Sequence, residues 1–165
     1  MPEASNPEFW ICRKFDWVIT SWVWNNWELR DDSRVLVTLK TRKKFGTLFE
    51  GSFDSTQITL RYDRKKDLTT IEDSKHMDIA HIEKASKLDP IFHWKGTEFL
   101  MKYESNKGFV IYHENKLVAG TVFFRGSTPV YAWFTLYHHE NGYPPPGLIA
   151  IVGHYFAINR AMGYP

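Results

Sequence analysis

The fold is decided by the segment YPPPGLIAIVGHYFAINR at residues 143–160. Its three consecutive prolines cannot continue a strand, and a proline in the first turn is a good start for a helix. From Leu148 to Ile158 apolar residues, interrupted only by His154, occupy every side of a helical wheel, and Asn159 and Arg160 then end the run. A helix that is apolar on all sides must be buried on all sides. At about 1.5 Å per residue it is too short to cross a bilayer.

The chain before this segment, from Phe9 to His138, is typical of short strands separated by turns. Apolar residues alternate with polar ones in several runs, which predicts that one side of each strand faces a core; the runs include Val35/Val37/Leu39, Ile58/Leu60/Tyr62 and Phe99/Met101/Tyr103. The sequences at 105–108 and 114–116 are typical hairpin turns. We count roughly eleven to thirteen antiparallel strands, among them Phe9–Phe15 and Trp17–Trp24.

Together these patterns predict a mainly β protein. The economical solution is a closed antiparallel barrel of roughly twelve strands, with the apolar helix at about 147–160 threaded through its centre. We expect one domain over residues 9–165, preceded by a flexible segment at 1–8. The alternative is a β-sandwich with the helix across one end, although that would leave one side of the helix in water.

Composition and short motifs exclude several classes of function. A hydrophobic content of 43% excludes a disordered chain, and 21 Lys and Arg against 19 Asp and Glu argue against a nucleic-acid partner. The single cysteine, Cys12, excludes an intramolecular disulfide or a zinc site of paired cysteines. Residues 1–8 carry no targeting signal, so we expect a cytoplasmic protein. Gly-rich phosphate loops and Gly-x-Ser-x-Gly elbows are missing, so we expect no cofactor.

Three segments carry a family resemblance: Phe99-Leu-Met-Lys-Tyr103, Lys116-Leu-Val-Ala-Gly-Thr121, and the final helix from Gly147 to Arg160. With about a dozen strands before an apolar helix, the chain resembles the tubby C-terminal-like superfamily, which includes the LURP-one-related proteins and phospholipid scramblases. The resemblance implies a barrel with a central helix, and contact with a lipid or another apolar ligand. It implies no site residues, because the phosphoinositide-binding Lys and Arg of tubby proteins have no match here.

The clustered tryptophans are candidate walls of an apolar ligand site. The residues concerned are Trp17, Trp22, Trp24, Trp27 and Trp94. Clustered indoles can line a pocket, stabilise a cation or lie at a membrane interface. Strand alternation would place Trp22 and Trp24 on one side of a sheet and Trp17 on the other. Packing within the core is the alternative explanation.

His154, His93 and Glu28 are the candidate acid–base residues if the protein is an enzyme. An imidazole inside an apolar helix could transfer a proton to a substrate in a neighbouring pocket. The alternative for His154 is a neutral core residue bonded to a backbone carbonyl. Glu28 could partner the tryptophans or be exposed.

We predict no metal site, because no strand or helix places two histidines at chelating spacing. His138 and His139 are adjacent and would point to opposite sides of a strand, and His76 and His81 have opposite parity. Two basic groups, represented by Lys43, Lys44, Arg64 and Lys65, could bind lipid phosphates if the fold brings them together. Otherwise they are ordinary solvated turns.

Two functions remain open from the sequence. The first is a barrel that binds a lipid or an apolar small molecule, with peripheral contact to an anionic membrane. The second is a cofactor-independent isomerase or cyclase that acts on a terpenoid- or polyketide-like substrate in an aromatic-lined pocket, where positioning supplies much of the catalysis. A large apolar pocket that receives a His or a carboxylate would favour the enzyme.

Overall fold

The computed structural model describes residues 5–21, 23–42, 47–87, 89–124 and 131–162. In this part of the chain, twelve strands form a closed antiparallel barrel in which each pairs with its sequence neighbours and β12 returns to β1. The strands are β1 (Lys14–Ser21), β2 (Asn26–Asp31), β3 (Arg34–Thr41), β4 (Leu48–Phe53), β5 (Thr56–Asp63), β6 (Leu68–Asp73), β7 (Asp78–Glu83), β8 (Ile91–Trp94), β9 (Thr97–Glu104), β10 (Gly108–His113), β11 (Lys116–Phe124) and β12 (Tyr131–Leu136). The predicted barrel is confirmed.

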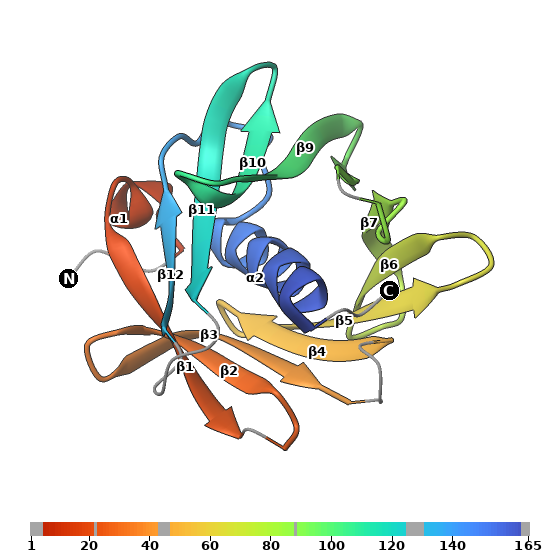
Figure 1. Cartoon of the computed structure of the whole chain (residues 1–165), viewed down its shortest axis with the longest axis horizontal. Helices are drawn as coiled ribbons and strands as arrows, with labels where there is room; N and C mark the ends of the chain where they lie inside the picture. Colours follow the sequence, from red (N-terminus) through yellow and green to blue (C-terminus); the bar gives the residue numbers. More distant parts are fainter. Residues whose placement is uncertain (1–4, 22, 43–46, 88, 125–130, 163–165) are drawn as a thin grey trace.

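Helix α2 (Pro146–Met162) runs through the inside of the barrel, as Figure 1 shows. Its first hydrogen bonds run from the amides of Leu148 and Ile149 to the carbonyl of Pro145, so the helix begins at the prolines, as predicted. Residues 147–159 are all buried. The threaded helix is therefore confirmed. No helix among the described residues is long and apolar enough to span a membrane.

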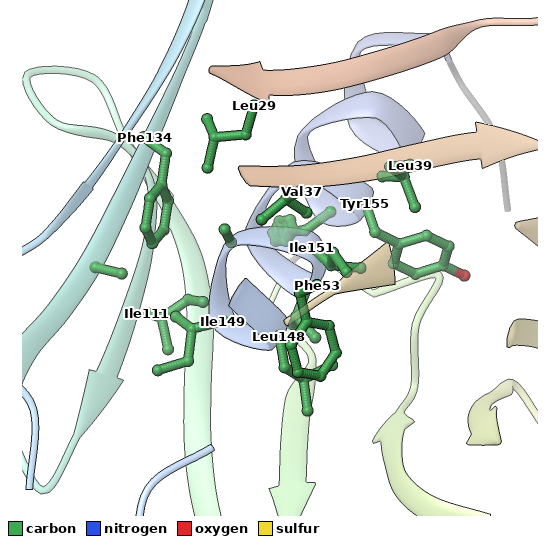
Figure 2. Close-up of a cluster of buried hydrophobic side chains, with 14 of the residues drawn as sticks. Leu29, Val37, Leu39, Phe53, Ile111, Phe134, Leu148, Ile149, Ile151 and Tyr155 are labelled. Atoms are coloured by element: carbon green, nitrogen blue, oxygen red, sulfur yellow. The ribbon is translucent and has the colours of Figure 1, made fainter. Parts of the chain in front are cut away.

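Helix and barrel wall share one apolar core (Figure 2), in which Leu148, Ile151 and Tyr155 of α2 lie among side chains of the surrounding strands. Each large side chain buried in this way contributes about 1.5–3 kcal/mol. The helix comes close to the wall at Gly147, where a Cβ atom would lie 2.5 Å from Cβ of Phe53. At Gly153, further along the helix, a Cβ atom would lie 2.8 Å from Oγ1 of Thr121. Of these two helix glycines, Gly147 at the start of the helix leaves less room for a side chain.

The N-terminal strands begin and end differently from the prediction. Instead of a strand over Phe9–Phe15, residues Pro7–Trp10 form the short helix α1, which Asn6 caps by accepting a hydrogen bond from the amide of Glu8. Proline after an Asn cap favours such a helical start over a strand. Trp10 packs on Phe15 and Phe134, with ring centroids 4.8 and 6.0 Å away, and so covers the core where β1 begins.

Alternation also fails at two positions that were predicted to face inward. In β3, Val35 is exposed and Leu36 and Val37 are both buried, because the pairing with β2 shifts by one residue between Leu29 and Arg30. Such a β-bulge reverses the side to which the preceding side chains point. Tyr103, near the end of β9, is also exposed and packs against Phe109 of β10 at 5.1 Å.

Because all strands are antiparallel neighbours, the turns alternate between two ends of the barrel. We call the end where α2 begins the proximal rim; its turns are 32–33, 54–55, 74–77, 95–96 and 114–115. The other end, where α2 finishes, is the distal rim. Its fully described turns are 64–67 and 105–107, and residues 23–25 and 84–87 belong to it as well.

Candidate functional site

The interior of the barrel holds one ionisable imidazole, that of His154, within a group of aromatic rings. Trp17 of β1 stacks on it, with centroids 4.2 Å apart and planes 14° apart. Trp27 of β2 meets it edge-on at 4.6 Å, and Phe123 of β11 lies at 5.9 Å. His154 itself has no exposed surface. It is therefore a core residue that the surrounding rings separate from solvent.

Burial without a polar partner sets the charge of this histidine. Neither ring nitrogen of His154 has a hydrogen-bond partner, and the same is true of Nε1 of Trp17 and Oγ1 of Thr121 nearby. Burial lowers the pKa of His154 well below its usual value, because nothing compensates the desolvated cation. The imidazole is neutral. The backbone hydrogen bond that we expected for a core histidine is not formed.

The predicted ligand-binding tryptophans do not form one site. Trp17 and Trp27 belong to the core around His154, and Nε1 of Trp27 donates to Oδ1 of Asn25 at 2.6 Å. Trp94 is buried in β8, with Nζ of Lys95 4.9 Å from its ring centroid. Trp24 lies in the turn after β1 and not on a strand, and it is exposed. Trp22 lies outside the described residues.

The other candidate acid–base residues are on the outer surface of the barrel. Glu28 alternates with buried Trp27 and Leu29, and accepts two hydrogen bonds from Arg30, at 2.9 and 3.1 Å. His93 alternates with buried Phe92 and Trp94. Neither side chain points towards His154, so the three predicted catalytic residues are not brought together.

Of the predicted phosphate-binding residues, Arg64 and Lys65 lie in the exposed turn between β5 and β6. The carboxylate of Asp63 accepts hydrogen bonds from the amides of Lys65 and Lys66, at 2.9 and 3.4 Å, which orders the turn. Lys43 and Lys44 lie outside the described residues. Other exposed basic residues share the distal rim with Arg64 and Lys65; they are Lys66, Lys84, Lys87 and Lys107.

Asp67 lies in the turn between β5 and β6, and its carboxylate is engaged within the protein. Two other acidic residues at this rim, Asp63 and Asp89, are exposed. It accepts hydrogen bonds from the amide and hydroxyl of Ser86 and from the hydroxyl of Tyr62. Partial burial tends to raise the pKa of Asp67, but these hydrogen bonds outweigh it and hold the pKa below the usual value. The carboxylate joins the 64–67 and 84–87 turns and so brings their basic residues to one side of the rim.

The same rim exposes an apolar turn. Val23 and Trp24 have exposed fractions of 87% and 58%. The turn is held by Asn25, which is buried, adopts a φ of 53°, bonds Trp27 through its side chain, and accepts a hydrogen bond from Thr41 through its carbonyl. Asn25 thus fixes the turn, and two consecutive apolar side chains extend into solvent.

Arg160 lies in the last turn of helix α2, at this rim. Nη1 of Arg160 donates to the carbonyl of Ser86 at 2.9 Å, and Nη2 is buried with no hydrogen-bond partner. The neighbouring Oδ1 of Asn159 is also without a partner. Both residues line a small crevice with Met101 and Phe156.

Sequence reasoning did not group Val23 with the lysines at 84 and 87. The alternation of side chains along a single strand does not reveal this grouping. It follows instead from the alternation of successive turns between the two ends of a barrel. Counting every second turn from the N-terminus would have grouped them.

Comparisons with known proteins give a likeness at the level of the fold. No family model matches the chain, and no curated protein sequence matches it. Among solved structures the chain is similar to the X-ray structure of a protein from Arabidopsis thaliana, with 16% identity, a TM-score of 0.55, and coverage of 97% of this chain and 98% of that one. At this identity the likeness shows that the two chains share a fold over nearly their whole length.

Proposed function

We propose that the protein is a lipid-binding module that places the distal rim of its barrel on an anionic membrane surface. The observation that carries the proposal is the position of the exposed Val23–Trp24 turn and the basic turns at one end of the molecule. A peripheral membrane site needs both apolar insertion and positive charge, because either alone gives weak, reversible attachment.

The two rims differ in charge, and only the distal one suits an anionic surface. The described turns of the proximal rim mix signs, with Asp32, Asp54 and Glu114 beside Lys75 and Lys95. In the distal rim six exposed basic residues (Arg64, Lys65, Lys66, Lys84, Lys87 and Lys107) outnumber the exposed Asp63 and Asp89, while Asp67 is engaged with Ser86. Each Lys or Arg near an anionic leaflet contributes about 1 kcal/mol. A few such residues therefore hold the rim at the surface.

Trp24 supplies the apolar part of the contact. Tryptophan concentrates at membrane interfaces, where its ring lies among the headgroups. Its turn is ordered by Asn25, so insertion loses little conformational freedom.

The structure gives less support to the other possibilities that the sequence left open, a ligand in the barrel centre and an enzyme. The barrel centre is occupied by α2, so we place the lipid contact at the rim. His154 is enclosed by aromatic rings, and no specific observation favours the isomerase or cyclase. The proposal extends to membership of the tubby C-terminal-like superfamily and to a cytoplasmic location, where anionic lipids are enriched in the facing leaflet.

The direct test is co-sedimentation with phosphatidylcholine vesicles, with and without phosphatidylserine, at low and high salt. We expect binding that needs phosphatidylserine and weakens as salt rises. Replacing Lys65 and Lys66 by Gln removes two charges, and should weaken binding by about 2 kcal/mol, or roughly 30-fold. Trp24→Ala should weaken the binding that remains at high salt.

The matched control removes two charges from the proximal rim, by replacing Lys75 and Lys95 with Gln. This variant has the same net charge as the distal one, and should bind vesicles nearly as well as the wild type. Equal loss of binding in both double variants would mean that net charge alone attracts the protein to lipid. That result, or absence of binding to phosphatidylserine vesicles at low salt, would overturn the proposed function.

A further inference from the structure

The outer wall of the barrel carries a second cluster of chemically active side chains, far in sequence from the helix and the distal-rim apolar turn. Register places His81 of β7 directly opposite His93 of β8, and His93 opposite Glu98 of β9. Glu83 lies two residues after His81 and therefore on the same side of β7. The three neighbouring strands thus gather two imidazoles and two carboxylates on one surface.

We propose that His81, Glu83 and His93 form a binding site for a divalent transition-metal ion of the zinc type. Each of the three offers one donor atom, and these atoms all lie within 4.8 Å of one another. Nε2 of His93 is 3.1 Å from Oε2 of Glu83, and Nε2 of His81 is 3.9 Å from Oε1 of Glu83. Donors bound tetrahedrally to zinc at about 2.0–2.1 Å lie about 3.3 Å apart. Small side-chain rotations would bring the three donors to that spacing.

The state of the two imidazoles suits metal binding. Their rings are stacked, with centroids 4.4 Å apart and planes 14° apart. Two protonated rings would repel each other in this arrangement. A neutral imidazole keeps the lone pair that a metal ion requires.

His93 has an unsatisfied nitrogen that faces the cluster. Its Nε2 is buried and makes no hydrogen bond, because the close approach of Glu83 does not have hydrogen-bond geometry. On the other side of the same ring, Nδ1 lies 3.7 Å from Oε1 of Glu98. A metal-bound histidine commonly presents its second nitrogen to a carboxylate, and this pair has that arrangement. A metal at Nε2 would satisfy the atom that the protein leaves without a partner.

The surroundings leave room for an exchangeable ligand. The cluster borders a surface hollow of about 460 Å³, lined also by Thr70, Asp78 and Lys95. Asp78, Glu83 and Glu98 outnumber Lys95, the basic residue among the described residues that line the hollow, so the local charge favours a bound cation. Two His and one carboxylate leave one or more positions to water, and nitrogen donors select zinc, nickel or copper over magnesium or calcium.

The test is zinc binding to the full chain at neutral pH, measured by competition with a chromophoric chelator after treatment with EDTA. We expect one zinc per chain, with magnesium and calcium unable to compete. His81→Gln and Glu83→Gln should each weaken zinc binding at least tenfold. In a histidine NMR spectrum, zinc should shift the ring signals of His81 and His93.

A matched control is His76→Gln, which removes an exposed histidine that lies 3.5 Å from Glu72 outside the cluster. This variant should bind zinc as the wild type does. His81 is more exposed than His93, so His81→Gln decides the proposal even if a His93 variant does not fold. Failure of the wild type to bind zinc, or equal affinity in the His81→Gln and His76→Gln variants, would overturn the site.

Discussion

Histidines inside and outside this barrel have opposite environments. His154 lies against Trp17 and Trp27 with no carboxylate and no hydrogen bond, and burial keeps it neutral. His81 and His93 lie on the outer wall, within reach of Glu83 and Glu98. The same side chain serves as an aromatic packing unit in one region and as a potential ligand in the other. Burial of the helix stabilises the fold, whereas the outer wall and the rims carry the side chains that a partner could contact.

The largest difference in stability between a variant of the interior and a variant of the exterior should appear when the substitution introduces a charge. Ile151→Asp places a carboxylate in a fully buried position of α2, and should lower the free energy of unfolding by more than about 4 kcal/mol. Leu100→Asp makes a similar change on an exposed position of β9, and should cost less than about 1 kcal/mol. Urea unfolding of both variants measures the contrast. If Ile151→Asp unfolds within about 0.5 kcal/mol of the wild type, the helix is not in a dry core.

Two tryptophans in the same part of the sequence sharpen the comparison. Trp27→Ala removes a buried ring beside His154 and should cost about 3–5 kcal/mol. Trp24→Ala changes an exposed ring and should shift stability by less than about 0.5 kcal/mol. Thermal or urea unfolding of the two variants tests this, and similar losses in both would contradict the assignment of Trp24 to an outward turn.

Glycines probe how closely the helix approaches the wall. Gly147→Ala brings a Cβ atom within 2.5 Å of Cβ of Phe53, and overpacking of this kind costs about 1–3 kcal/mol. In Gly120→Ala, the new atom meets Cε2 of Tyr137 at an ordinary 3.4 Å, on the side of β11 away from the helix. We expect little destabilisation there. Denaturant midpoints that fall in the reverse order would show that the helix start can move.

The smallest effect concerns acid stability. The pKa of His154 is lowered in the folded state, so the unfolded chain binds more protons below its ordinary pKa of about 6.5. The contribution of the neutral His154 to the free energy of unfolding is fully present above a pH of about 6.5. Below that pH it falls by up to about 1.4 kcal/mol for each pH unit. His154→Leu should therefore lose less stability than the wild type between pH 7 and 5. Parallel slopes of unfolding free energy against pH would contradict a neutral, buried imidazole.

Periodicity predicted the barrel and helix because those features depend on local patterns. The segment from Leu148 to Ile158 is apolar on all sides, so a helix formed by it must be buried on every side. In most strands, the alternation of apolar and polar residues then predicts which side faces this helix. The failures occur where an extra residue enters a strand, as at Leu36, or where a strand reaches a rim, as at Tyr103. A bulge depends on the partner strand, and parity within one strand does not reveal it.

Candidate sites were less predictable because they depend on pairing between strands. His81 and His93 are twelve positions apart, and only the β7–β8 register places them face to face. The prediction of no metal site considered spacing within single elements, and so did not consider this pair. Glu28 was grouped with the tryptophans by proximity in sequence, although alternation points it to the opposite side from Trp27.

The position of α2 after all twelve strands has a consequence for biosynthesis. A ribosome adds about 5–20 residues per second, so every strand leaves the exit tunnel before the segment that fills the space between them. During that interval the inward rows of Phe, Leu and Ile have no helix to contact, and the nascent sheet exposes them to chaperones and to other chains. Barrel closure must therefore wait until translation has delivered Pro146–Met162, and the yield of folded protein depends on how well the cell protects the open sheet until then.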